Sequence, residues 1–294
     1  MATRWLTFDC FGTLVDWRHG IGTTGELLFP GRGAALLGAY IEIEAEVENE
    51  KPFRRYRVVL AETLRRAAAR LKLDLKHDDA TALTSTIPHW PVFPDVGPTL
   101  RALHAEGWKL ALLTNCDRDL IALTERRLPE PFDAVITAED VSAYKPDPAH
   151  FRRFESVFGG SADVWIHIAQ SYYHDIKPAA ALGIRRIWIN RQGEKDDPAL
   201  ADAVLPGLGD LPDAVKRHRA HGGDLGQCDA LRCSCGNEPH LNGFHTVHRI
   251  GDGRWVVADP AGGPGGGPTQ CFGCGAVYSE SYEFVEVAAT APRD

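Results

Sequence analysis

The chain has 294 residues, 44% hydrophobic and 24% charged, so it can bury a sizeable core and is expected to form more than one folding unit. Its formal net charge of −8 argues against a general nucleic-acid or anionic-membrane surface. No apolar stretch is as long as a membrane span, and residues 1–4 lead into strand-like sequence without a signal-peptide core. A cytoplasmic protein is therefore expected.

The first predicted element is a buried strand over Trp5–Phe8, which ends at Asp9. Gly12 follows closely and permits a sharp turn. In open α/β sheets, ligands bind at the carboxyl ends of strands, where such turns point side chains into a crevice. A carboxylate at that place can attack carbon or phosphorus and form a covalent ester. Asp9 is thus the candidate nucleophile, and the alternative is an aspartate that only caps a helix.

Residues 34–86 are predicted to be helical, with no clear strand. Apolar residues there follow helical spacing, as in Leu60, Leu64, Ala68 and Leu71. The arginines of Arg54–Arg57 are candidates for binding a carboxylate, because a guanidinium binds planar anions bidentately. A solvated helix face is the simpler interpretation of each arginine taken singly.

From about residue 94 to residue 205, apolar runs alternate with helix-like stretches, which is typical of a doubly wound parallel sheet. Polar side chains follow three of these runs. Leu110–Leu113 ends in Thr114 and Asn115, Ser142–Tyr144 leads into Lys145, and Val164–Ile168 leads to Gln170, Ser171 and Asp175.

These segments and that of Asp9, in this order, resemble the haloacid dehalogenase (HAD) superfamily, and most closely its type II, L-2-haloacid dehalogenase-like branch. The resemblance covers roughly the first two hundred residues. It implies an α/β fold, with a doubly wound parallel-sheet core of residues 1–15 and 90–205. It also implies an inserted helical cap of residues 16–89, which would cover the strand ends and exclude water from the pocket.

The resemblance also implies roles for single residues. Lys145 would hold the nucleophile, Asp175 would position the water that hydrolyses the ester, and Ser171 would support them. Thr114 and Asn115 would offer a hydroxyl and an amide to a substrate carboxylate, although Thr and Asn are also common where strands turn. Thr13 would bond the nucleophile or orient its loop.

Two positions differ from the superfamily's phosphatases. Those enzymes carry a second aspartate two residues after the nucleophile, which protonates the leaving alkoxide, whereas this chain has Phe11. A phenyl ring cannot act as a general acid, but it suits a leaving group that departs as a stable anion, such as halide. Gln170 stands where the phosphatases have an aspartate that helps to hold Mg²⁺. No metal is therefore expected at the catalytic site, and Mg²⁺ would be required only by a phosphatase.

The predicted function is hydrolysis of a small 2-substituted carboxylate by displacement at carbon, through a covalent aspartyl ester. Three alternatives remain: a HAD-type phosphatase of a small phosphate ester, a hydrolase that opens a strained cyclic amino acid, and a non-catalytic binding protein. The pocket is expected to differ from that of well-studied dehalogenases, because Leu37–Glu42 lacks their cap arginine and Tyr172–His174 replaces their Asn and Trp. His167 and His174 are expected to be structural. The sequence does not identify the substrate.

Residues 206–221 are predicted to form a linker, and residues 222–294 a small β domain. A predicted hairpin, Phe244–Ile250 with Arg254–Ala258, lies between two cysteine pairs, Cys233 with Cys235 and Cys271 with Cys274. This arrangement is close to a zinc ribbon with one structural Zn²⁺. Cys228 or His240 is an alternative ligand, and disulfides are the alternative chemistry, disfavoured in the cytoplasm. The acidic tail is a candidate site for a protein partner rather than for nucleic acid, and a homodimer is a further expectation.

Overall fold

The computed structural model describes residues 4–159 and 165–219, together with strands at 244–249, 255–257, 269–271, 276–278 and 284–287. The chain divides into two compact units, Met1–Pro212 and Asp213–Asp294. No helix among the described residues is long and apolar enough to cross a membrane.

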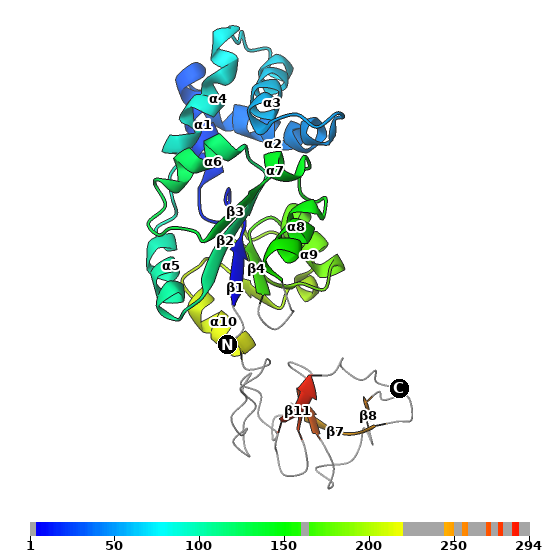
Figure 1. Cartoon of the computed structure of the whole chain (residues 1–294). Coiled ribbons are helices and arrows are strands. Elements are labelled where there is room, and N and C mark those ends of the chain that lie inside the picture. Colours follow the sequence, from blue (N-terminus) through cyan, green and yellow to red (C-terminus); the bar gives the residue numbers. More distant parts are fainter. Residues whose placement is uncertain are drawn as a thin grey trace. The chain divides into compact units, whose positions relative to one another are not determined.

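The core of the first unit is a parallel sheet with the strand order β3-β2-β1-β4-β5-β6 (Figure 1). Its strands are β1 Trp5–Phe8, β2 Lys109–Thr114, β3 Ala134–Thr137, β4 Trp165–Ala169, β5 Arg185–Ile189 and β6 Ala203–Leu205. The central strand β1 is buried throughout, with Leu6 paired to Leu110 on one side and to Ile166 on the other. The carboxyl ends of β1, β2 and β4 therefore meet at one edge of the sheet.

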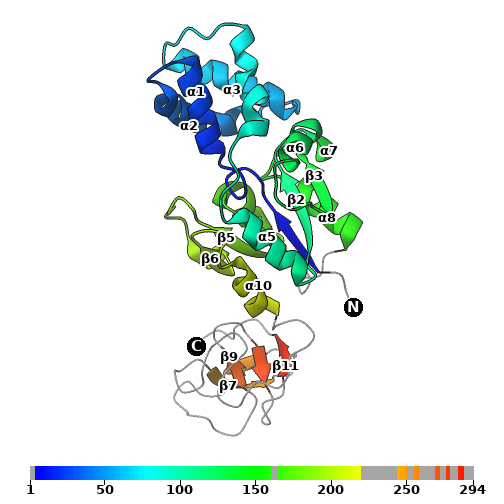
Figure 2. The same cartoon turned by 90° about the vertical axis from the view of Figure 1, so that its left-hand side faces the viewer.

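Helices cover both faces of this sheet, as Figures 1 and 2 show for α5 on one face and α8 on the other. They are α5 Val96–Ala105, α6 Arg118–Glu125, α7 Ala138–Val141, α8 Ala149–Phe158 and α9 Lys177–Ala181. Two further turns are η3 Tyr172–Ile176, which is π-helical, and η4 Pro198–Leu200. On the α8 face, Phe154 packs against Trp5 and Trp165, with ring centroids 5.4 and 4.7 Å away. The predicted doubly wound α/β core is confirmed.

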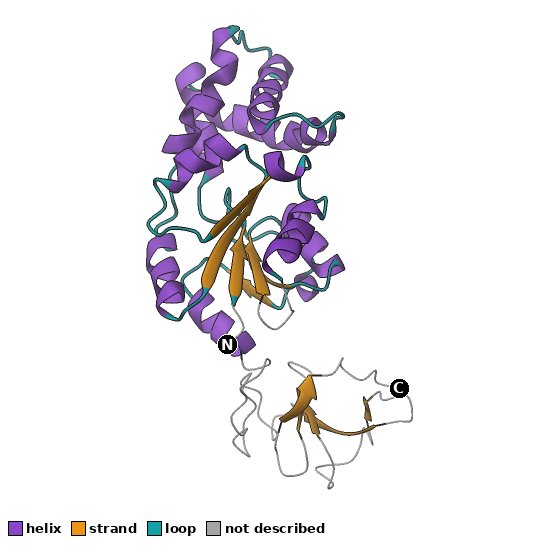
Figure 3. Cartoon of the chain, viewed as in Figure 1, coloured by secondary structure: helices purple, strands orange, loops and turns teal. Residues whose placement is uncertain are grey.

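Between β1 and α5, an all-helical insertion forms the cap (Figure 3). It contains α1 Trp17–Leu28, α2 Gly33–Asn49, α3 Tyr56–Arg70, η1 Asp78–Thr81, α4 Ala82–Thr86 and η2 Ile87–His89. The two chain segments that join cap and core run side by side. The Asp16 N–H donates to Pro91 O at 2.8 Å, and the Phe93 N–H donates to Leu14 O at 2.9 Å.

Part of the stretch interpreted as a linker is helical, because Leu211–Arg219 forms α10. Leu211, Ala214 and Val215 follow the i, i+3, i+4 spacing of a helix face, and all three are fully buried. The Pro and Gly residues around this helix favoured the interpretation as a linker. Apolar burial along this helix face outweighs that signal.

The second unit contains an antiparallel sheet with the order β11-β10-β9-β7-β8. Its strands are β7 Phe244–Arg249, β8 Trp255–Val257, β9 Thr269–Cys271, β10 Ala276–Tyr278 and β11 Phe284–Val287. The predicted hairpin is confirmed by the pairing of β7 with β8, in which Val247 lies opposite Val257. Cys271 ends β9, and the other predicted zinc ligands, Cys233, Cys235 and Cys274, lie outside the described residues, as do Cys228 and His240. The zinc site stays a prediction.

Candidate active site

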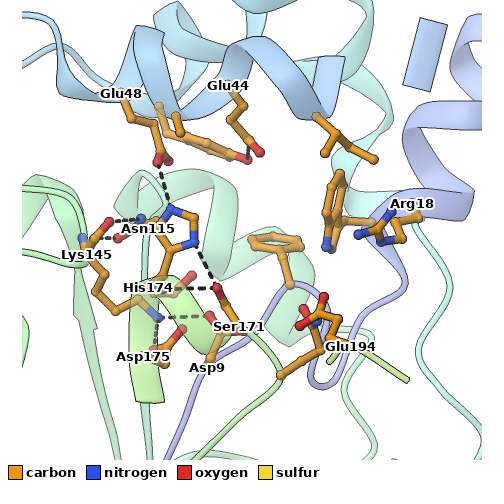
Figure 4. A pocket seen from close by; sticks show the side chains of 17 residues that line it. Asp9, Arg18, Glu44, Glu48, Asn115, Lys145, Ser171, His174, Asp175 and Glu194 are labelled. Carbon is orange, nitrogen blue, oxygen red and sulfur yellow. Dashed lines mark hydrogen bonds and ion pairs between the residues drawn. The ribbon is translucent and has the colours of Figure 1, made fainter. Parts of the chain in front are cut away.

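A pocket of about 190 Å³ lies between the strand ends and the cap (Figure 4). Its size suits a molecule of a few carbon atoms. The core side of its lining contains all but one of the eight residues predicted from the sequence, namely Asp9, Phe11, Thr114, Asn115, Lys145, Ser171 and Asp175. The remaining residue, Thr13, is buried and bonds Asp9 directly.

Asp9 is held at the end of β1 by a hydrogen bond from its backbone N–H to Ile168 O, 3.0 Å long. The following turn requires Gly12, which has a φ of +101° and whose Cβ would lie 2.8 Å from Gln170 Oε1. The Asp9 carboxylate accepts hydrogen bonds from Lys145 Nζ at 2.9 Å and from Thr13 Oγ1 at 2.9 Å. Burial raises the pKa of Asp9, and the charge of Lys145 opposes this without cancelling it.

Lys145 is a buried cation with no free N–H group. Its Nζ donates to Asp9 Oδ1 at 2.9 Å, to Asp175 Oδ1 at 2.6 Å and to Leu113 O at 2.8 Å. Burial lowers the pKa of Lys145, but the charges of Asp175 and Asp9 outweigh it, so the pKa is raised. The ammonium therefore stays charged and fixes the distance between the two carboxylates.

Asn115 holds the backbone of Lys145. Its Oδ1 accepts from the Lys145 N–H at 2.7 Å, and its Nδ2 donates to Lys145 O at 3.1 Å. These bonds use the Oδ1 atom and one amide N–H, which leaves one N–H for a ligand. Asn115 thus orients the lysine in addition to lining the pocket.

Asp175 is shared between Lys145 and a buried histidine. Its Oδ1 lies 2.9 Å from His167 Nε2, and His167 Nδ1 pairs with Thr7 Oγ1 at 2.9 Å. Burial raises the pKa of Asp175, but the charge of Lys145 and the hydrogen bond of His167 lower it to about 2. Its second oxygen, Oδ2, is buried and has no hydrogen-bond partner among the described residues. This oxygen is available to orient a water molecule.

Two buried threonine hydroxyl groups lie at the carboxyl ends of the strands. Thr13 Oγ1 donates to Asp9 and also accepts from the Gln170 N–H at 2.8 Å, so it joins the loops after β1 and β4. Thr114 Oγ1 is buried and lines the pocket without a hydrogen-bond partner in the described part of the chain. Its hydroxyl is therefore free to bind a polar group of a ligand.

Ser171 begins the π-helical turn η3 and connects to the cap through His174. Ser171 Oγ accepts from the His174 N–H at 3.1 Å and pairs with His174 Nδ1 at 2.9 Å. On the other side of the ring, His174 Nε2 lies 3.5 Å from Glu48 Oε2 of α2. His174 was expected to be structural, and the structure places it in the pocket lining, bridging core and cap.

The cap wall is acidic, which the sequence reasoning did not anticipate. Helix α2 presents Glu44 and Glu48, one helical turn apart, to the pocket. Glu44 accepts hydrogen bonds from Tyr40 Oη at 3.0 Å and Tyr56 Oη at 3.1 Å. Burial and the charge of Glu48 raise the pKa of Glu44 to about 7. The spacing of Tyr40, Glu44 and Glu48 puts them on one helix face, but that spacing alone does not show that this face is turned to the pocket.

The other side of the pocket combines aromatic rings with charges. Phe11 packs edge-to-face on Trp90, with centroids 5.7 Å apart. Trp17 and Arg18 of α1 line the pocket, as Figure 4 shows for Arg18 and for Glu194. The Gln170 amide donates to Glu194 Oε1 at 2.9 Å. Arg18 and Glu194 were also not predicted from the sequence.

The three cap arginines considered earlier do not line the pocket. Arg54 pairs with Glu50 at 2.6 Å, Arg55 with Glu139 at 3.1 Å, and Arg57 with Asp117 at 2.9 Å. Asp117 also accepts from the Tyr56 N–H at 2.6 Å, which caps α3 from the core. Arg55 and Arg57 thus hold the cap on the core, whereas Arg54 pairs within the cap.

Comparisons with known proteins agree with this geometry. The model of the haloacid dehalogenase-like hydrolase family matches residues 3–183. The chain is 27% identical to haloacetate dehalogenase H-2 of Moraxella sp. (strain B), over 64% of this chain and 86% of that protein. It is 26% identical to (S)-2-haloacid dehalogenase of Pseudomonas sp. (strain YL), over 71% and 88%. A crystal structure of an L-2-haloacid dehalogenase aligns with a TM-score of 0.66 at 26% identity, over 73% of this chain and 99% of that one.

Proposed function

Because the chain belongs to the haloacid dehalogenase-like hydrolase family, we propose that it hydrolyses small 2-haloacids, with Asp9 as the covalent nucleophile. The observation that carries this proposal is the position of Asp9. Its carboxylate lies in a pocket for a small molecule, and Lys145 and Thr13 hold it through one hydrogen bond to each oxygen. The names of the relatives support displacement at carbon.

In the first step, an Asp9 oxygen attacks C2 of the substrate. The carbon–halogen bond breaks, halide leaves with the electron pair, and an ester joins Asp9 to C2. Lys145 favours the ionised form of the nucleophile. The leaving halide needs no proton, so Phe11 can occupy the position at which a phosphatase needs a general acid. Its ring instead contributes an apolar wall to the pocket.

In the second step, a water molecule attacks the carbonyl carbon of the ester. Asp175 Oδ2, which has no partner among the described residues, accepts a hydrogen bond from this water and orients it. The bond between the ester oxygen and the Asp9 carbonyl carbon breaks, and the product leaves as a 2-hydroxy acid. The water oxygen remains in the Asp9 carboxylate. One proton of the water ends on the hydroxyl group of the product, and the other goes to solvent.

The proposal extends to features outside the pocket. The tail would hold one structural Zn²⁺ through Cys233, Cys235, Cys271 and Cys274, and the catalytic site would need no divalent metal. A homodimer, a cytoplasmic location and a protein partner for the tail complete the proposal. The phosphatase alternative is disfavoured by Phe11 and by Gln170, whose amide is bound to Glu194.

A screen of halide release from small 2-haloacids, beside phosphate release from phosphate esters with and without Mg²⁺, tests the reaction class. Asp9→Asn should reduce turnover by roughly three or more orders of magnitude, as loss of a nucleophile does. The exposed Asp147→Asn is the matched control. Single turnover in ¹⁸O water should place the label in Asp9. Label that appears first in the product would exclude the covalent route.

A further inference from the structure

A substrate carboxylate that enters the pocket needs a cation to replace the water it loses. Helix α2, where the family resemblance leads one to expect an arginine, presents Glu44 and Glu48 instead. The cationic side chains that line the pocket are Lys145, His174 and Arg18. A substrate anion can use only a cation whose charge is not already paired with a carboxylate of the protein.

Lys145 and His174 already lie beside carboxylates of the protein. All three N–H groups of the Lys145 ammonium donate to protein oxygens, two of which belong to Asp9 and Asp175. His174 lies between Ser171 and Glu48, with the Glu48 carboxylate 3.5 Å from its Nε2. Neither group offers a substrate anion an unopposed charge.

Arg18 is different, because no carboxylate lies within ion-pair distance of it in the described part of the chain. Its guanidinium stacks on the ring of Trp17, 5.0 Å from the centroid, and both residues line the pocket. Stacking occupies the face of the guanidinium and leaves its N–H groups in the plane for an anion. A carboxylate can bind there bidentately.

The remaining charges orient the substrate. Glu44 and Glu48 lie on α2, whereas Arg18 projects from α1 on the other side of the pocket (Figure 4). The cation that no carboxylate pairs with closely is thus on the α1 side. Glu194 also lines the pocket and feels the charge of Arg18, but its carboxylate accepts its hydrogen bond from the Gln170 amide.

Building on the proposed function, we propose that Arg18 is the substrate-carboxylate binding residue of this enzyme, in place of an arginine on α2. It determines specificity for an acid over a neutral molecule of the same shape. It takes no part in the displacement itself.

The test pairs a charged with a neutral substrate, 2-chloropropionate and 2-chloropropionamide. Arg18→Gln should raise KM for the acid by roughly 10- to 100-fold, with a smaller change in kcat, and should leave the amide nearly unaffected. Arg18→Lys should restore part of the loss. The control is Arg65→Gln on the outer surface of the cap, where Arg65 pairs with Glu62 at 3.6 Å.

Binding of unreactive propionate and propionamide, measured by calorimetry, separates this inference from the proposed reaction. If the wild type releases halide from neither chloro compound, the proposed function fails, whereas selective loss of propionate binding in Arg18→Gln still supports the inference. Equal losses for acid and amide in folded Arg18→Gln would overturn it, because they would indicate a structural or leaving-group role. Unchanged acid binding would overturn it as well.

Discussion

His174 Nε2 lies 3.5 Å from Glu48 Oε2, so an ion pair joins the loop after β4 to helix α2 of the cap. Burial lowers the pKa of His174, but the hydrogen bond and charge of Glu48, with Asp175 and Glu44, outweigh it and raise the pKa. The folded protein thus holds the proton more tightly than the unfolded chain does. This pair should make closure of the pocket depend on pH.

The pH dependence follows from the direction of that shift. A raised histidine pKa contributes stability fully below the unfolded value of about 6.5, and the contribution is lost as pH rises through the folded pKa. A double-mutant cycle with His174→Gln and Glu48→Gln should give a coupling of about 1 kcal/mol at pH 6 and almost none at pH 9. Urea unfolding at both pH values measures it. A coupling that does not change with pH would contradict the prediction.

The matched control is the pair of His104 and Glu130, which lies 3.4 Å apart and belongs to the core alone. Glu130→Gln should leave KM unchanged. Glu48→Gln should change it, since Glu48 lines the pocket.

Replacing Lys145 should affect stability and activity together. Lys145→Met leaves the buried carboxylates of Asp9 and Asp175 without a cation, which costs about 3–5 kcal/mol of unfolding free energy. The pKa of Asp9 should rise further, so less of the nucleophile is ionised at a given pH, and the acid limb of kcat/KM moves to higher pH. Lys109→Met, which breaks an exposed ion pair of 2.6 Å with Asp133, should cost at most about 1 kcal/mol.

Halide release should not depend on a divalent metal. The ammonium of Lys145 already lies between the carboxylates of Asp9 and Asp175, and Gln170 contributes an uncharged amide. We expect unchanged kcat after chelation followed by dialysis, with folding checked by circular dichroism because the tail is expected to hold zinc. Activity that is lost and returns with Mg²⁺ in folded protein would refute this.

The tail should contain about one equivalent of zinc per chain. A small domain with a Gly/Pro-rich loop buries too little surface to fold without a structural metal ion or a covalent cross-link. Elemental analysis of purified protein measures it. Cys271→Ser should lose the zinc and become sensitive to protease in the tail, while halide release continues. Zinc-free protein whose tail resists protease, with thiols that alkylate freely, would refute the claim.

Residues on the core side of the pocket could be predicted from the sequence better than residues on its cap side. Asp9 and Gln170 directly follow β1 and β4, and Thr114 ends β2, so strand order alone brings them together. Lys145 comes from a loop after α7, and its place was predicted from family resemblance. Asn115 was expected to bind substrate, and its bonds to the Lys145 backbone could not be foreseen, because they depend on two loops meeting in space.

The charged residues of the cap show why the cap side of the pocket could not be predicted from the sequence. Glu44 and Glu48 have the same local sequence character as Glu42 and Glu46, which are exposed on the same helix. Only the docking of α2 decides which pair faces the pocket. Arg18 stands next to the α1 start, and nothing in its neighbours distinguishes it from a solvated arginine. Long-range packing fixes these positions, whereas periodicity fixes only the helix.

The paired segments between cap and core limit how the pocket can open. Val15 and Val92 form a bridge between them, so the cap is held at one edge by two paired chain segments rather than by a single one. We expect such an attachment to permit rotation of the cap about one axis and to resist twisting of the cap relative to the core. Where product release requires the cap to turn on this attachment, the speed of that rotation sets an upper limit on the turnover rate.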